Sequence, residues 1–197
     1  MVVLGRFWFL NPTIMNLLAA FLNRIASPRN LLILIVLYVL FPAYFLKHAE
    51  EDINQLSGKI IGPIDLTIGF DPERTLQMVA DYSDTARSQY ATTELTIDVV
   101  YPLVYALLFG VILTLLFRKK PYAPLSWLNA LPFVMQGFDY LENGCIVVLL
   151  KTFPDTSYNI AVACETFKLL KWLVMLAVVG LILYGLVRLV IHKIREA

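Results

Sequence analysis

The sequence predicts an all-α fold, a four-span transmembrane helical bundle with an N-terminal interfacial helix and a partly helical extracytoplasmic loop. Of its 197 residues, 59% are hydrophobic and 16% are charged, whereas soluble domains carry roughly 25% charged residues. The mean hydropathy is +0.71, and several apolar runs are long enough to cross a bilayer, which takes about 20 helical residues. These observations exclude a water-soluble globule and fit a single membrane domain over residues 1–197.

The four expected spans begin and end at local sequence signals. Ser27 and Pro28 are typical of the start of a helix, and Pro42 is expected to kink the last turn of the first span. Short connections at 118–121 and 151–155 predict that the second, third and fourth spans pack as antiparallel neighbours. The expected spans cover residues 28–48, 96–117, 125–150 and 159–191.

Charge is distributed unevenly between the two sides of the expected bundle. The loop at 49–95 carries nine acidic and three basic residues. Basic residues instead cluster before the first span, after the second and at the C-terminus. Under the positive-inside rule, both termini are cytoplasmic and the loop is extracytoplasmic, as expected for a plasma membrane or bacterial inner-membrane protein. The clustered bases are Arg6, Arg24, Arg29, Arg118, Lys119, Lys120, Arg188, Lys193 and Arg195.

Two segments lie outside the expected spans. Residues 11–26 begin with Asn11-Pro12 and repeat apolar residues at helical spacing, which predicts an amphipathic helix in the cytoplasmic interface. The alternative is that this helix packs under the bundle as ordinary core. In the outer loop, residues 58–70 are rich in turn-forming residues and resemble a hairpin. Asp71-Pro72 then starts a helix that is expected to continue toward Tyr90 over the outer mouth of the bundle.

The rare reactive residues give no metal or cofactor signal. The chain has two cysteines and two histidines, too few for a disulfide framework or a four-ligand zinc site. No nucleotide-binding glycine pattern occurs, and the net charge of +1 predicts no nucleic acid partner. We therefore expect no cofactor. Cys145 and Cys164 fall at matching heights of the last two spans, where buried packing is favoured over a disulfide.

Polar groups inside the expected spans form the candidate site, because charge in hydrocarbon is costly and usually faces a bundle interior. Asp98, Tyr101 and Tyr105 share one face of the second span at i, i+3 and i+7. Polar residues of the third and fourth spans recur at three- and four-residue spacing, and the topology places all of them near the outer mouth. The candidate ligand-binding residues are Asp98, Tyr101, Tyr105, Asp139, Glu142, Asn143, Glu165 and Lys168.

The third and fourth spans are expected to form an antiparallel hairpin. In that register Glu142 pairs with Lys168, and Asp139 pairs with Lys171. Such pairs can serve only to hold helices in register, since lipid supplies no hydrophobic drive between helices. The second and fourth spans each add a further acid, however, so four acids oppose two lysines. Protonation, water, a cation or a ligand must offset this excess, which favours a binding cavity.

Three functions fit these observations. The first is an outward-facing intramembrane polar cavity that binds or translocates a small lipid-like or cationic molecule. The second is a membrane-embedded enzyme acting on a lipid-like substrate, in which Asp139, Glu142 or Glu165 is the acid or base and Tyr101 or Tyr105 orients the substrate. The third is an accessory subunit whose outer loop docks a membrane protein partner. The lipid bilayer is the expected partner in every case.

Overall fold

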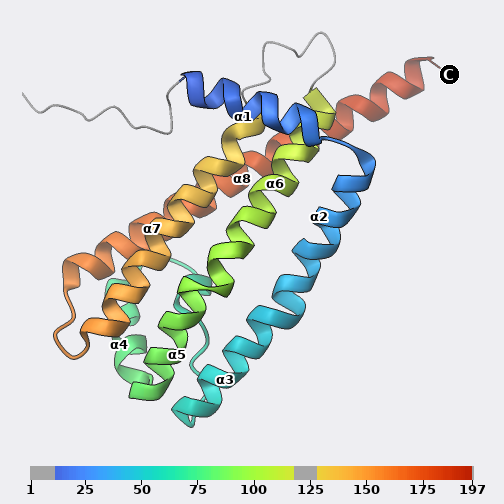
Figure 1. The fold of residues 1–197 in the computed structure, drawn as a ribbon. Helices are drawn as coiled ribbons and strands as arrows, with labels where there is room; N and C mark the ends of the chain where they lie inside the picture. Colours follow the sequence, from blue (N-terminus) through green and yellow to red (C-terminus); the bar gives the residue numbers. More distant parts are fainter. Residues whose placement is uncertain (1–11, 118–127, 197) are drawn as a thin grey trace, which may run out of the picture.

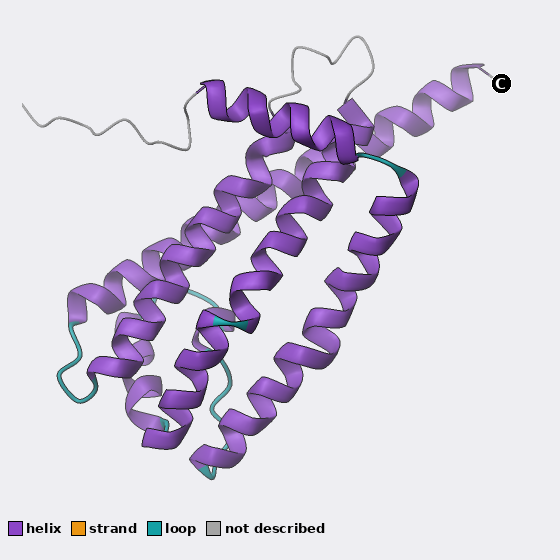
Figure 2. Cartoon of the chain, viewed as in Figure 1, coloured by secondary structure: helices purple, strands orange, loops and turns teal. Residues whose placement is uncertain are grey.

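The structure is a computed structural model that describes residues 12–117 and 128–196. It is all-helical, with 87% helix and no strand in the described residues (Figure 2). Four helical segments are long and apolar enough to cross a membrane, in agreement with the number of spans expected from sequence. These segments are Pro28–Ser57, Asp84–Phe117, Leu128–Thr152 and Tyr158–His192.

Helix α1 (Pro12–Ile25) lies across one end of the bundle, here named the α1 end (Figure 1). Leu22 on its inner face is fully buried against α6 (Ile97–Phe117). A Cβ added at Gly110 of α6 would lie 3.0 Å from Leu22 Cδ2, which is a tight contact, so the glycine favours this close approach. Leu17 and Phe21 remain exposed. The helix thus packs under the bundle on one face and leaves the other face apolar and uncovered.

Helix α2 (Pro28–Leu40) begins where the sequence predicts, with the Ser27 hydroxyl accepting a hydrogen bond from the Asn30 amide. It continues without interruption through a π-helical segment (Phe41–Leu46) into α3 (Lys47–Ser57) and ends at Gly58, whose φ is +68°. Pro42 lies in the π-helical segment, where the missing amide is accommodated by a wider backbone turn. The helix therefore continues for nine residues beyond residue 48, where the sequence analysis ends the first span, into the expected loop.

The opposite end of the bundle, here named the loop end, holds a short 3₁₀ helix (Ile64–Leu66), α4 (Pro72–Asp81) and α5 (Asp84–Leu95). Asp71 caps α4 as predicted, its carboxylate accepting from the Arg74 amide at 2.9 Å. The expected single helix to Tyr90 is wrong, because Ser83 caps a new helix and redirects the chain. The expected hairpin at 58–70 is also wrong, since none of these residues forms a strand.

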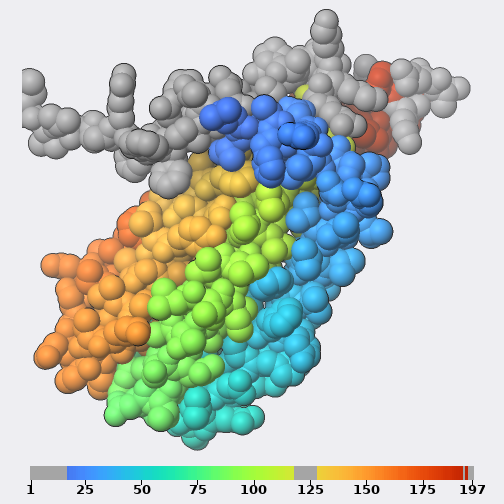
Figure 3. Space-filling view, in the orientation of Figure 1, coloured from blue at the N-terminus to red at the C-terminus, as the bar shows by residue number. Residues whose placement is uncertain are grey.

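Helices α6, α7 (Leu131–Thr152) and α8 (Tyr158–Glu196) pack as antiparallel neighbours, as the short connections predict (Figure 1). The bounds of α6 agree with the expected 96–117 to within a residue. The part of the expected third span before residue 128 lies outside the described residues. Helix α8, about 58 Å long at 1.5 Å per residue, projects past α1 (Figure 1). Figure 3 shows α1 seated across the ends of α6 and α7.

The largest cluster of buried apolar side chains sits at the loop end. It joins α3, α4, α5, α7 and α8 around Ile146, Leu149 and Tyr82, all of which are 1% exposed or less. Cys145 and Cys164 are both free thiols, and Cys164 belongs to this cluster, as the packing interpretation predicts. In contrast, no residue of α2 is buried. The loop end of the molecule therefore holds the main apolar core, while α2 packs on its neighbours through partly exposed side chains.

Candidate functional site

A cavity of about 550 Å³ lies between α2, α3, α5, α6, α7 and α8. Its volume is within the range of about 300–1,000 Å³ that is typical of small-molecule sites. Pro63, Asp65 and Leu66 line its loop end, so the segment after α3 lies over the cavity on that side.

The α6 wall carries the three residues that share a face in the sequence. Asp98, Tyr101 and Tyr105 all line the cavity. The Tyr105 hydroxyl donates to Asp139 Oδ2 at 2.5 Å. Asn143 Nδ2 donates to Asp98 Oδ2 at 2.9 Å, so α7 orients the Asp98 carboxylate from behind. The structure thus brings these five predicted residues together on α6 and α7.

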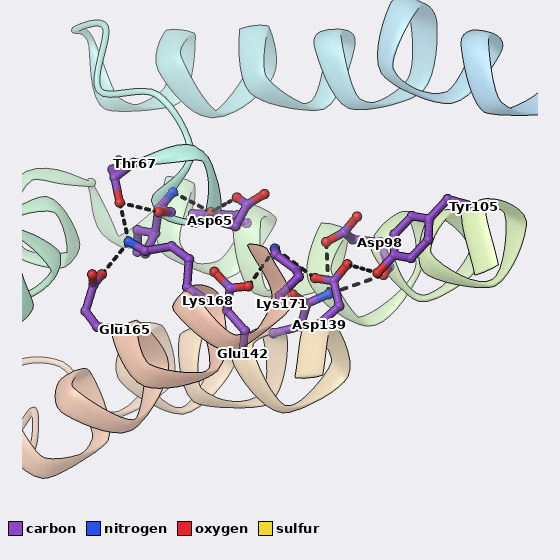
Figure 4. Close-up of polar contacts among 12 residues, drawn as sticks. Asp65, Thr67, Asp98, Tyr105, Asp139, Glu142, Glu165, Lys168 and Lys171 are labelled. Carbon is purple, nitrogen blue, oxygen red and sulfur yellow. Dashed lines mark hydrogen bonds and ion pairs between the residues drawn. The ribbon is translucent and has the colours of Figure 1, made fainter. Parts of the chain in front are cut away.

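Lys171 is the central cation of the site (Figure 4). Its ammonium lies 3.1 Å from Asp139 Oδ1 and 2.6 Å from Glu142 Oε2. The Asp139–Lys171 pair is confirmed, whereas the expected pairing of Glu142 with Lys168 is wrong. Asp139 and Glu142 are three residues apart on one face of α7, so a single long side chain from α8 reaches both carboxylates.

Lys168 and Glu165 form a separate buried cluster that faces α4 and the segment before it (Figure 4). The Lys168 ammonium lies 2.5 Å from Glu165 Oε1 and donates to the Thr67 hydroxyl at 2.5 Å. Glu165 also accepts from the Thr75 hydroxyl at 2.7 Å and from the Asp71 amide at 3.0 Å. Neither Glu165 nor Lys168 lines the cavity. These two predicted site residues are instead positioned to fasten the loop end to α8.

Asp65 and Glu94 line the cavity, although the sequence analysis did not select them. Asp65 accepts from the Tyr90 hydroxyl at 3.2 Å. Burial raises the pKa of the Asp65 carboxyl, while the nearby Lys171 ammonium opposes that rise. Glu94 is 3% exposed, and its Oε2 is buried without a hydrogen-bond partner. The only sequence signal for Glu94 is its spacing of four residues from Asp98, which favours one face if the helix continues.

No family model, curated protein or solved structure matches this chain. The chemistry of the site must therefore be inferred from its own residues.

The cavity is strongly acidic and partly aromatic. Among the described residues that line it, five are acidic and two are basic. Of the two bases, Lys171 is already held by Asp139 and Glu142, and Lys47 is exposed and lies 3.9 Å from Glu51. No cluster of His, Cys, Asp or Glu in the described part of the chain could hold a metal ion.

Tyrosine rings line the cavity beside the ion pairs. Tyr38 of α2 stacks on Tyr101 with ring centroids 5.8 Å apart, and Tyr105 meets Tyr101 edge to face at 5.6 Å. The electron-rich faces of aromatic rings attract ammonium groups, by about 2 kcal/mol or more when water is excluded. Acids and aromatic rings therefore surround the same space.

Proposed function

We propose that this protein binds a small amphiphilic organic cation, such as a protonated amine, in the cavity between α2 and the rest of the bundle. The observation that carries the proposal is the buried Glu94 Oε2, which has no hydrogen-bond partner although Glu94 lines the cavity. Leaving a buried polar atom unpaired costs about 1–3 kcal/mol, and more for a charged group. A ligand ammonium would supply the missing donor and offset part of the acid excess.

The surroundings of Glu94 support an amine over a neutral ligand. Asp98 lies in the first turn of α6, four residues after Glu94 and beyond the break at Thr96 between α5 and α6, and it also lines the cavity. Its carboxylate is oriented by Asn143, an amide that donates a hydrogen bond without adding positive charge. Lys171 is engaged by two carboxylates from α7. Glu94 and Asp98 are therefore available to bind a second cation.

The test compares a compact amine with a neutral molecule of the same shape. Full-length protein in lipid nanodiscs is titrated with cyclohexylammonium or with cyclohexanol while the midpoint of thermal unfolding is recorded. At about tenfold its Kd, a ligand stabilises a protein by about 1.4 kcal/mol, which is about 3–6 °C for a chain of this size. We expect this shift with the amine and not with the alcohol.

Glu94→Gln is expected to abolish the amine-dependent shift while leaving the ligand-free protein as stable as before or more stable. The amide keeps the shape of the side chain and removes a buried acid. Glu51→Gln is the matched control, because Glu51 is exposed on α3 and does not line the cavity. An equal amine shift in wild type and Glu94→Gln would show that the binding role assigned to Glu94 is wrong.

We further propose that the four apolar helices cross a membrane with both termini on the cytoplasmic side. The asymmetry of charge between the two ends of the bundle supports this orientation. Cysteines placed at Lys59 and Asn159, which are exposed at the loop end, should react with an impermeant thiol reagent in intact cells. A cysteine at position 119 should react only after permeabilisation, and its labelling in intact cells would reverse the orientation.

A further inference from the structure

The lining of the cavity combines charged and apolar groups. Acids come from α5, α6, α7 and the segment after α3, and apolar or aromatic side chains include Tyr38 of α2 and Trp172 and Met175 of α8. A ligand complementary to this lining has a charged head and an apolar body. The volume of about 550 Å³ leaves room for more than an ammonium group.

Residues 61–67 form part of the lining of the cavity at its loop end. This segment contributes Pro63, Asp65 and Leu66 to the lining and is fixed at both ends and in its middle. The backbone of residues 61–64 is bonded to α3, to Tyr82 just after α4 and to α5, and the side chain of residue 67 is bonded to α8. The bonds are Ile61 N to Asn54 Oδ1 at 2.9 Å, Tyr82 Oη to Gly62 O at 2.5 Å, Ile64 N to Tyr90 Oη at 2.8 Å, and Lys168 Nζ to Thr67 Oγ1 at 2.5 Å.

Exposed residues join the lining of the cavity on the side of α2 and α8. Pro42, in the π-helical segment that follows α2, lines the cavity and is exposed. No residue of α2 itself is buried, and its Tyr38 stacks on Tyr101 of α6. Trp172 lines the cavity and is also 40% exposed, so it lies at the boundary between the cavity and the outer surface of the helices.

We propose that the ligand is a single-chain lipid amine that reaches the cavity sideways from the bilayer, between α2 and α8. This inference rests on the proposed function. The ammonium head lies among Glu94 and Asp98, and the alkyl chain passes Met175 and Trp172 toward the lipid. A membrane-resident amphiphile never has to move its chain through water on this route.

The fluorescence of Trp172 tests the route directly. The chain has three tryptophans, so Trp8→Phe and Trp127→Phe leave Trp172 as the only one. This full-length variant in phosphatidylcholine nanodiscs is titrated with dodecylammonium that carries a bromine midway along its chain, since bromine quenches nearby tryptophan. Dodecanol brominated at the same carbon measures quenching by chains that are merely dissolved in the bilayer.

We expect stronger quenching by the brominated amine than by the brominated alcohol, and recovery of fluorescence when unbrominated dodecylammonium is added. Adding Glu94→Gln should reduce amine quenching to the level of the alcohol. The recovery of fluorescence with unbrominated dodecylammonium is measured without any substitution at position 94. The test can therefore be decided even if Glu94→Gln does not fold.

Two other outcomes separate this inference from the proposed function. Equal quenching by amine and alcohol without recovery, together with a normal thermal shift by cyclohexylammonium, would overturn the sideways route for a lipid amine and leave small-cation binding intact. If neither cyclohexylammonium nor dodecylammonium stabilised the protein, both the sideways route and the proposed function would be overturned.

Discussion

Replacing Lys171 by Met should be among the most damaging changes within the bundle, because one ammonium serves two carboxylates. The side chains of Asp139 and Glu142 are 8% and 0% exposed, and that of Lys171 is 11% exposed. Removing one partner of a buried ion pair costs about 3–5 kcal/mol. At about 2–4 °C per kcal/mol, the midpoint of thermal unfolding should fall by about 6–20 °C, with the lower values expected if water from the cavity hydrates the stranded acids.

A double-mutant cycle separates this pairing from the one expected from sequence. Glu142→Gln alone should cost less than Lys171→Met, since Lys171 then keeps Asp139. The double variant should lose less than the sum of the single losses, with a coupling of about 0.5–3 kcal/mol. The control cycle of Glu142→Gln with Lys168→Met should be additive within about 0.5 kcal/mol. Coupling in the control cycle and none in the first would refute the reasoning.

Three further tests concern the loop end, the α1 contact and the cavity acids. Glu165→Gln should speed amide hydrogen exchange over α4 without changing amine affinity, because Glu165 holds Asp71 and Thr75 outside the cavity. Gly110→Ala should cost about 1–3 kcal/mol of thermal stability, since its Cβ would lie 3.0 Å from a Leu22 methyl and 3.1 Å from a backbone oxygen. Gly144→Ala, which has open space, should be neutral or stabilise by about 1 kcal/mol. Asp65→Asn should gain stability relative to wild type as the pH rises, as measured by the unfolding midpoint at each pH.

The sign for Asp65 follows from its raised pKa. A carboxyl whose pKa is higher in the folded state contributes stability below its unfolded pKa, and that contribution is lost as the pH rises through the folded pKa. The neighbouring groups Lys171, Asp139 and Tyr90 also influence the pKa of Asp65. A constant difference between wild type and Asp65→Asn from acidic to neutral pH would contradict this reasoning. Loss of amine binding in Glu165→Gln would contradict the role of Glu165 outside the cavity. Equal losses of stability in Gly110→Ala and Gly144→Ala would contradict the close contact of Gly110 with α1.

Local signals in the sequence were sufficient for much of the helical architecture. Ser27-Pro28 and Asp71-Pro72 mark helix starts that the structure confirms, because capping is a contact between residues three apart. Residues 97–117 form the second long apolar helix close to its expected bounds. Local signals failed where neighbouring elements compete, as at Ser83, where the chain turns into a new helix instead of continuing to Tyr90.

The cavity could be predicted only in part. The face shared by Asp98, Tyr101 and Tyr105 follows from helical geometry alone, and all three line the cavity. Asp65 could not be found, because its position depends on hydrogen bonds from α3, Tyr82, α5 and α8 to the segment that carries it. Glu94 was missed because the expected span began after it, whereas α5 brings it to the same wall.

The sequence by itself determined that this chain is all-helical, with four long apolar helices and a set of acids and lysines at matching heights. Periodicity and composition are properties of the chain, so they can be obtained without a fold. Only the tertiary structure decided that Lys171 serves both Asp139 and Glu142, while Lys168 turns to Glu165 and Thr67. Helix phase and the reach of a lysine side chain allow either partner, and the choice depends on where segment 61–67 packs against α8.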